Sequence, residues 1–430
     1  MNDAAMNDAA TPRPPQTSQP NDGATRRPDR SAVVNEPLER LLAILRYDSV
    51  SSRSNRDISD LVARWLTELG FEVSRQDYRD NAGILKANLV ATRLPIKGQS
   101  ADRSAIDRSA IDRPAIDRPG VAYFAHTDVV PVDCWRGPGD AFEPVVEDGR
   151  VYGRGSCDMK GSLVAMITAA SRIDRRDQTA PIRIVCTADE EVGFIGAKRL
   201  VADFPEYRQI VATQPLAIIG EPTCCQVVHA HKGIAALAVT SYGRAAHSSS
   251  REGLNANLAM VPMLVELARL YERSESELSF RDPRFDPPTV TWTFGVSDHC
   301  DAVNITPARS DAWVSLRTMP SVDADELIRA IEVKAGELGL TFRQLHGGPP
   351  MWVDPSNPYI TALCELAGCS SPQTVCYATD GGEFVELENR VVCGPGDIAQ
   401  AHTSDEWISL EQLERGIDLY ERVLRRWCLG

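Results

Sequence analysis

The sequence predicts an α/β fold with a mostly parallel sheet and helices on both of its faces, plus an inserted α+β sandwich domain. Short apolar runs bounded by turn residues alternate with segments of helical spacing, a pattern typical of buried parallel strands and crossover helices. The pattern changes at residue 229 and returns after residue 344. The length of 430 residues also favours two cores over one.

The first part of the predicted α/β domain contains helices and strands in alternation. Helical spacing predicts helices at residues 38–45, 57–69 and 161–173. Apolar runs predict strands at residues 86–91, 121–125, 182–188 and 216–219. This alternation is what predicts the parallel sheet.

The inserted segment has a different order of elements. We expect strands at residues 235–242, 289–296 and 311–317, and helices at residues 255–273 and 324–338. This order forms most of an α+β sandwich with an antiparallel sheet, which we place at residues 229–344. The α/β pattern resumes at residues 358–366 and 391–393 and closes with a helix at residues 410–427. The α/β domain, which contains the candidate site residues described below, therefore comprises residues 34–228 and 345–430.

Two tracts are predicted to lie outside the packed core. Residues 1–33 contain a doubled MNDAA and several prolines, a composition typical of a disordered tail. Residues 102–120 repeat a five-residue unit that matches neither helix nor strand spacing. We interpret this second tract as an expanded, low-complexity loop between two strands.

Composition argues against nucleic acids and membranes as partners. The net charge is -14 and the basic residues are dispersed, whereas phosphate binding needs a basic face. No run approaches the roughly 18 apolar residues that cross a bilayer. The 11 cysteines lack paired CxxC spacing, and the N-terminus lacks an apolar signal region. We therefore expect a soluble, cytoplasmic protein that binds neither nucleic acid nor a membrane.

Carboxylate and imidazole side chains follow the predicted strands, at the edge where open α/β sheets bind their ligands. They occur in five motifs, which contain His126 with Asp128, Asp158, Glu190 with Glu191, Glu221, and His402. Such a set suits two metal ions in an oxygen-rich site, with one carboxylate left over as a base. The sequence therefore predicts a dinuclear metallohydrolase.

The spacing of these residues suggests separate roles. His126 and Asp128 face the same side of an extended chain, so Asp128 could hold the far ring nitrogen of His126. Asp158 lies in a glycine-bracketed turn, where one carboxylate could reach two ions. Glu190 and Glu191 are adjacent and diverge, so one can bind metal while the other takes a proton from water.

Other interpretations of these motifs stay open at this point. A single His-x-Asp is usually an ordinary surface or core pair, and Glu-Glu is usually a solvated helix turn. Only the occurrence of all five motifs in this order, each at a strand edge, is specific for a metal site. Cys157 or Cys186 could be a nucleophile, but nearby carboxylates disfavour a thiolate, so packing is the better interpretation.

The motifs resemble those of the dinuclear zinc amidohydrolases, which include acetylornithine deacetylase, succinyl-diaminopimelate desuccinylase, aminoacylase and related carboxypeptidases. The resemblance extends from about residue 38 to the C-terminus. It is carried by residues 125–132 (AHTDVVPV), 151–161 (VYGRGSCDMKG), 189–193 (DEEVG), 219–223 (IGEPT), 231–233 (HKG) and 243–248 (GRAAHS).

The resemblance implies that five side chains bind two zinc ions, with Co²⁺ as an alternative metal. His126, Asp158 and Glu221 would hold one ion, and Asp158, Glu191 and His402 the other. Asp158 would bridge them, with a cis peptide bond to the following residue.

The resemblance also implies roles for residues around the metals. Glu190 would be the general base and then the acid, and Asp128 would orient the ring of His126. The inserted segment would be a lid through which two chains form a homodimer. Its His247 would stabilise the oxyanion in a partner's site, and Asn304 and Arg317 would bind the substrate carboxylate.

The C-terminal segments are most similar to acetylornithine deacetylase. Residues 394–406 resemble its final histidine motif, and residues 377–383 its substrate loop, in which Gly381 and Glu383 are candidate substrate-binding residues. The repeat at residues 102–120 and the stretch 134–139 depart from the family pattern. His229, His231, His299 and His346 receive no role.

We therefore expect metal-dependent hydrolysis of an N-acyl amino acid, with N-acetylornithine the leading candidate. A desuccinylase, an aminoacylase or a dipeptidase on the same scaffold is the alternative. A silent metal-stabilised binding protein is disfavoured, because it would gain nothing from the additional buried carboxylate of Glu190.

Overall fold

The computed structural model describes residues 35–96 and 118–429. The predicted tail at residues 1–33 and most of the predicted loop at residues 102–120 lie outside the described residues. From Pro37 onward, the described residues belong to one compact unit.

The main sheet has nine strands within the described residues. Its four central strands run parallel, as predicted: β6 (Ile182–Thr187), β3 (Val121–His126), β7 (Leu216–Ile219) and β15 (Arg390–Val392). Antiparallel strands flank them, with β2 (Leu85–Arg93) and β1 (Glu72–Arg79) on one side and β8 (Val228–His231) and β13 (Met351–Trp352) on the other. A short strand, β14 (Gln373–Val375), pairs parallel to β8.

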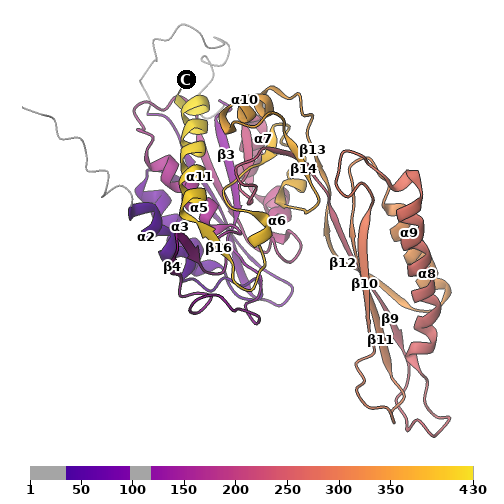
Figure 1. The fold of residues 1–430 in the computed structure, drawn as a ribbon. Helices are drawn as coiled ribbons and strands as arrows, with labels where there is room; N and C mark the ends of the chain where they lie inside the picture. Colours follow the sequence, from indigo (N-terminus) through magenta and orange to yellow (C-terminus); the bar gives the residue numbers. More distant parts are fainter. Residues whose placement is uncertain (1–34, 97–117, 430) are drawn as a thin grey trace, which may run out of the picture. The chain divides into compact units, whose positions relative to one another are not determined.

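Helices cover both faces of this sheet (Figure 1). One face packs against α2 (Asn35–Leu45), α3 (Arg56–Glu68), α5 (Lys160–Ser171), α10 (Pro358–Ala367) and α11 (Leu410–Leu424). The other face packs against α6 (Ile195–Asp203) and α7 (Pro205–Thr213). In β3, Tyr123 faces the first group of helices and its neighbour Phe124 faces the second. Burial on both faces explains why β3 is apolar without alternation.

The inserted segment forms a four-stranded antiparallel sheet. Its strand order is β10 (Thr291–Ser297), β11 (Arg309–Arg317), β9 (Ile234–Tyr242) and β12 (Thr341–Gly348). Two helices, α8 (Ala256–Ser276) and α9 (Asp325–Glu337), close a separate apolar core over it. The boundaries at residues 229 and 344 stay a prediction; the sheet itself spans residues 234–348.

A third, small sheet joins distant parts of the chain. Its strands are β16 (Trp407–Ser409), β5 (Arg150–Tyr152) and β4 (Val145–Glu147). Sequence patterns miss these three-residue strands because they are too short to show periodicity. They also miss β1, whose mostly polar residues lie at an edge of the main sheet. In the described ranges, no helix is long and apolar enough to cross a membrane.

A buried ion pair ties β2 to the turn after β6. Lys86 Nζ lies 2.6 Å from Asp189 Oδ1 and donates to the backbone oxygen of Ser51 at 2.6 Å. The Tyr78 hydroxyl donates to Asp189 Oδ2 at 2.9 Å. Both charged side chains are almost completely buried, so each needs the other.

We expect Lys86→Met to destabilise the protein by about 3–5 kcal/mol, because it leaves the Asp189 carboxylate buried without its cation. The free energy of unfolding in urea measures this. The control is Arg269→Met, which breaks an exposed pair with Glu266 and should cost at most about 1 kcal/mol. The double variant Lys86→Met/Asp189→Leu should recover part of the loss; equal midpoints for Lys86→Met and the control would contradict the prediction.

Candidate metal centre

The predicted metal ligands gather at the carboxyl edge of the central strands. His126 is the last residue of β3, Glu191 follows β6, and Glu221 follows β7. Asp158 lies in the turn before α5, and His402 lies in the loop between β15 and β16. The parallel order of the strands brings the first three side chains to one edge.

Three of these residues form a buried group. The Nε2 atom of His126 lies 3.1 Å from Asp158 Oδ1 and 3.7 Å from Glu221 Oε1. One ligand atom from each residue lies within 4.8 Å of the other two. The group offers one nitrogen and two oxygens to an ion, as zinc sites do.

A second group shares Asp158 with the first. The Nε2 atom of His402 lies 3.0 Å from Glu191 Oε2 and 3.4 Å from Asp158 Oδ2. The two oxygens of Asp158 thus face different histidines, which is the arrangement a bridging carboxylate requires. The peptide bond from Asp158 to Met159 is cis, as the resemblance implied. The structure therefore assembles all five predicted ligands into two groups.

Burial and mutual repulsion shape the charge of these groups. Burial raises the pKa of both Glu191 and Glu221, and the charge of Asp158 raises it further. Burial also opposes ionisation of Asp158, but His126 and His402 outweigh it and lower its pKa. Glu191 Oε1 is buried with no hydrogen-bond partner in the described parts of the chain. Several buried carboxylates and an unpartnered oxygen fit a pair of bound cations.

Glu190 is buried beside these groups but belongs to neither. Burial raises its pKa well above the usual value; His126 opposes this, while Glu221 and Glu191 add to it. A buried carboxyl group that neither metal group uses is free to accept and return a proton.

The Asp128 side chain makes different contacts from those predicted. Its backbone oxygen, not its carboxylate, is the near acceptor of His126 Nδ1, at 2.9 Å; the carboxylate is 3.7 Å away. The carboxylate instead accepts from Ser51 Oγ at 2.7 Å and from the backbone NH of Glu190 at 3.2 Å. Asp128 therefore holds the ring through its carbonyl and the Glu190 turn through its side chain.

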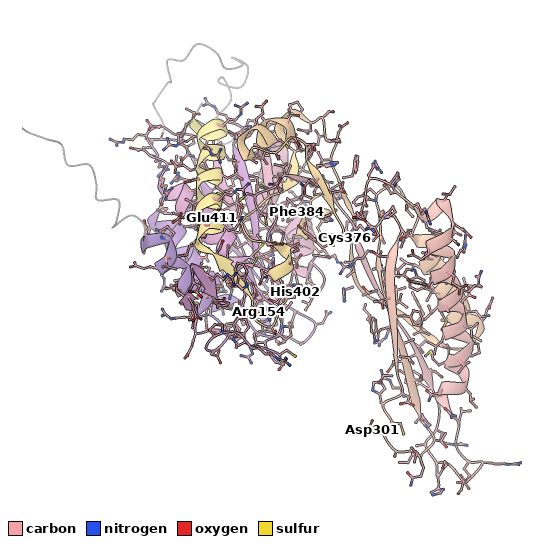
Figure 2. All side chains as sticks on the ribbon, in the orientation of Figure 1. Arg154, Asp301, Cys376, Phe384, His402 and Glu411 are labelled. Atoms are coloured by element: carbon pink, nitrogen blue, oxygen red, sulfur yellow. The ribbon has the colours of Figure 1, made fainter. Side chains whose placement is uncertain are left out.

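Glu406 is a positioning residue that sequence reasoning missed. Its buried carboxylate accepts from the backbone NH groups of Gly155, Cys157 and Asp158 at 3.0, 2.8 and 2.9 Å. It also accepts from Arg154, whose other nitrogen binds the backbone oxygen of Thr403 at 2.9 Å. Figure 2 labels Arg154 and His402, which lie near each other although distant in sequence. The one sequence signal is that Glu406 closes the histidine motif.

The three residues predicted to act from the lid lie at opposite ends of the second sheet. Arg317 ends β11 beside Gly233, whose backbone pairs with Thr318. Arg317 is half-buried; burial lowers its pKa, and Glu190 is close enough to oppose that shift. His247 and Asn304 are exposed in the loops beyond the other end, where His247 pairs with Ile305. The structure thus brings His247 and Asn304 near each other but not near Arg317.

The predicted substrate loop contains a short 3-10 helix, Asp380–Gly382. Gly381 is buried within it. Glu383 follows, with Oε1 buried and 3.7 Å from Lys198 Nζ. Burial raises the pKa of Glu383, and Lys198 opposes this shift.

The four histidines without a predicted role and the two buried thiols lie in environments typical of residues with a structural role. His229 Nδ1 contacts the Val353 oxygen at 2.7 Å, and His231 Nδ1 contacts the Lys232 oxygen at 2.8 Å. His299 is exposed and pairs with Asp311, and His346 lies near Lys198 and Arg317. Burial raises the pKa values of Cys157 and Cys186, which supports packing over nucleophilic roles.

Two histidine–carboxylate groups that share one aspartate, with a free glutamate beside them, define a metal-dependent hydrolase on an α/β scaffold. The chain belongs to peptidase family M20/M25/M40, whose model matches residues 122–426. This confirms the resemblance found in the sequence and establishes the chain as a hydrolytic enzyme.

Similar proteins agree with this assignment. The chain is 32% identical over 396 residues to an acetylornithine deacetylase of Proteus mirabilis (strain HI4320), covering 90% of this chain and 94% of the relative. It is 31% identical over 401 residues to that of Myxococcus xanthus, covering 91% and 97%. Human carnosine dipeptidase 1 shares the fold, with a TM-score of 0.69, 17% identity and coverage of 92% and 96%. So does the M20 family metallo-carboxypeptidase Sso-CP2 of Sulfolobus solfataricus, with a TM-score of 0.68, 17% identity and coverage of 91% and 99%.

We expect Glu406→Gln to weaken metal binding by about 10–100-fold, because an amide replaces one of the oxygens that hold the Asp158 turn. Metal content after dialysis against a graded chelator measures this. The control is Glu411→Gln, an exposed change at the start of α11 (Figure 2). Equal metal retention in the two variants would show that Glu406 does not position Asp158.

Proposed function

We propose that this enzyme hydrolyses the amide of N-acetylornithine to give ornithine and acetate, a step of arginine biosynthesis. The observation that carries the proposal is Glu190, a buried carboxyl group that neither metal group uses. The acetylornithine deacetylase relatives, which match about nine-tenths of the chain, support this substrate.

Five residues would hold two Zn²⁺ ions, with Co²⁺ as a substitute: His126, Asp158, Glu191, Glu221 and His402. When bound, the ions supply a hydroxide near neutral pH and polarise the scissile carbonyl. Glu190 takes the proton from the attacking water and returns it to the leaving amine. The Asp128 carboxylate accepts a hydrogen bond from the backbone NH of Glu190. This contact keeps the base in place during both proton transfers.

Arg317 would bind the substrate α-carboxylate. It is half-buried near Glu190, and a guanidinium matches a carboxylate with two parallel hydrogen bonds. Gly381 and Glu383 would line the site from the substrate loop. An amide without the α-carboxylate should therefore be a poor substrate.

The cytoplasm is the proposed compartment. All 11 cysteines lie in the described residues, and each is a free thiol. Free thiols are typical of a reducing compartment.

We expect the zinc- or cobalt-loaded enzyme to release acetate from N-acetylornithine faster than it hydrolyses N-succinyl-diaminopimelate, N-acetylmethionine, a dipeptide or N-acetyl-1,4-diaminobutane. Glu190→Ala should lower kcat by about 10²–10⁴-fold with both metals retained, because only proton transfer is lost. Glu191→Ala, the matched control, should lose metal. A faster reaction with another amide would replace the proposed substrate, and metal loss in Glu190→Ala would refute its role as base.

Helix α8 of the inserted segment has an exposed apolar surface suited to a second copy of this chain. Leu254, Leu258, Val261 and Val265 are spaced by three or four residues along and just before α8, and each is more than half exposed. Among the described strands, β10 forms an edge of the sheet, so its outer backbone groups can pair with another strand. We propose a homodimer through this surface, which we call the α8 stripe.

Dimerisation would give His247 and Asn304 a role. Both are exposed at the end of the sheet remote from Arg317, so they would act in a partner's site. His247 would stabilise the oxyanion there, and Asn304 would bind substrate.

We expect Val261→Glu/Val265→Glu to dissociate the dimer, because two carboxylates would be buried in the α8 stripe. Sedimentation velocity measures the mass, and kcat should fall with it. Val146→Glu, an exposed change on β4, is the control and should keep the wild-type mass and rate. A monomeric wild type would rule out the dimer, and a fully active monomeric variant would rule out the role of His247.

A further inference from the structure

The loop before Glu383 is anchored at the carboxyl edge of the main sheet. The hydroxyl of Thr187, the last residue of β6, donates to Asp380 Oδ2 at 2.6 Å. A Cβ added to Gly381 would lie 3.3 Å from Ile219, the last residue of β7. These contacts fix the loop between the two strands that lead to Glu190 and Glu221.

Tyr377 begins this loop, and its hydroxyl has no assigned role. The phenolic oxygen is buried and has no hydrogen-bond partner among the residues that the structure describes. Tyr377 lies near enough to Glu221 and Asp158 to interact with their charges. Because a phenol is a hydrogen-bond donor at neutral pH, the hydroxyl is a donor beside the first metal group. A buried donor without an acceptor is destabilising, and a substrate oxygen could supply the acceptor.

In the proposed reaction, Arg317 would bind the α-carboxylate and Glu190 would protonate the leaving amine. The carbonyl oxygen would contact the bound ions and, in a dimer, His247, but it has no donor yet from the chain that holds the metals. This oxygen gains negative charge as water adds to the carbon, so it can accept a further hydrogen bond. Tyr377 lies near Glu221 and Asp158, at the edge where this oxygen becomes charged, and a neutral donor is suited to such an oxygen.

We propose that Tyr377 is a catalytic residue whose hydroxyl donates a hydrogen bond to the scissile carbonyl oxygen, most strongly when that oxygen is an oxyanion. The inference rests on the proposed amide hydrolysis. Tyr377 keeps its proton throughout, so it stabilises charge and takes no part in the transfers by Glu190.

The chain offers a matched control in Tyr207. Its hydroxyl is also buried without a hydrogen-bond partner in the described residues. It lies on α7, where its charged neighbours are Glu386 and Arg390 and not the metal groups. Tyr207→Phe therefore makes the same chemical change away from the site.

The test compares Tyr377→Phe, Tyr207→Phe and wild type as full-length, metal-loaded enzymes on the N-acyl amino acid that wild type hydrolyses fastest. We expect Tyr377→Phe to lower kcat by about 10²–10³-fold, with KM and metal content unchanged, as for loss of one oxyanion donor. A phosphonate analogue with a tetrahedral centre should bind more weakly by a similar factor. Acetate should inhibit all three enzymes equally, and Tyr207→Phe should match wild type.

Several results would overturn the inference. Wild-type kcat in Tyr377→Phe would exclude the hydrogen bond, and loss of metal would show a structural role instead. A raised KM with unchanged kcat would mean that Tyr377 binds the ground state only. An inactive wild type would refute the proposed function together with this inference, whereas an active wild type with an active Tyr377→Phe would refute the inference alone.

Discussion

The buried negative charge at one edge of the central sheet is the constraint on which the rest of this structure depends. Asp158, Glu190, Glu191 and Glu221 lie together there, and the imidazoles of His126 and His402 balance only part of that charge. Removing one ion from water costs several kcal/mol. The surrounding fold must therefore hold groups that repel one another, and bound cations would complete the balance.

Three side chains oppose this repulsion by holding the two turns that carry the acidic residues. Glu406 accepts from the backbone NH groups of the Asp158 turn. Asp128 accepts from the backbone NH of Glu190, and Lys86 binds the side chain of Asp189, the residue before it. Because Glu406 and Asp128 bind the backbone and Lys86 binds Asp189, the metal-binding carboxylates remain free to bind ions. The parallel strands supply the location, and these contacts supply the geometry.

The conformation of the same turn gives the adjacent residues Glu190 and Glu191 different roles. Asp189 has a left-handed backbone with φ of 57°, a conformation that aspartate tolerates better than most residues. Beyond it, Glu191 reaches His402 while Glu190 remains outside both metal groups. Two chemically identical side chains thus occupy different environments one residue apart, as a metal ligand and a base require.

The sequence by itself determined the fold class, the ligand set and the edge on which the ligands lie. Apolar runs specify buried strands through local burial, and the residues just after such strands must meet at the carboxyl edge. Only the tertiary structure decided that the carbonyl of Asp128 holds His126 and that Glu406 supports Asp158, 248 residues away. It also separated Arg317 from His247 and left the Tyr377 hydroxyl without a hydrogen-bond partner among the residues described. The carbonyl of Asp128 is a local partner of His126, but its carboxylate is drawn away by Ser51, 77 residues earlier in the chain. This contact and that of Glu406 join distant segments, and such contacts leave no periodic pattern in a sequence, because they are set by packing and not by local spacing.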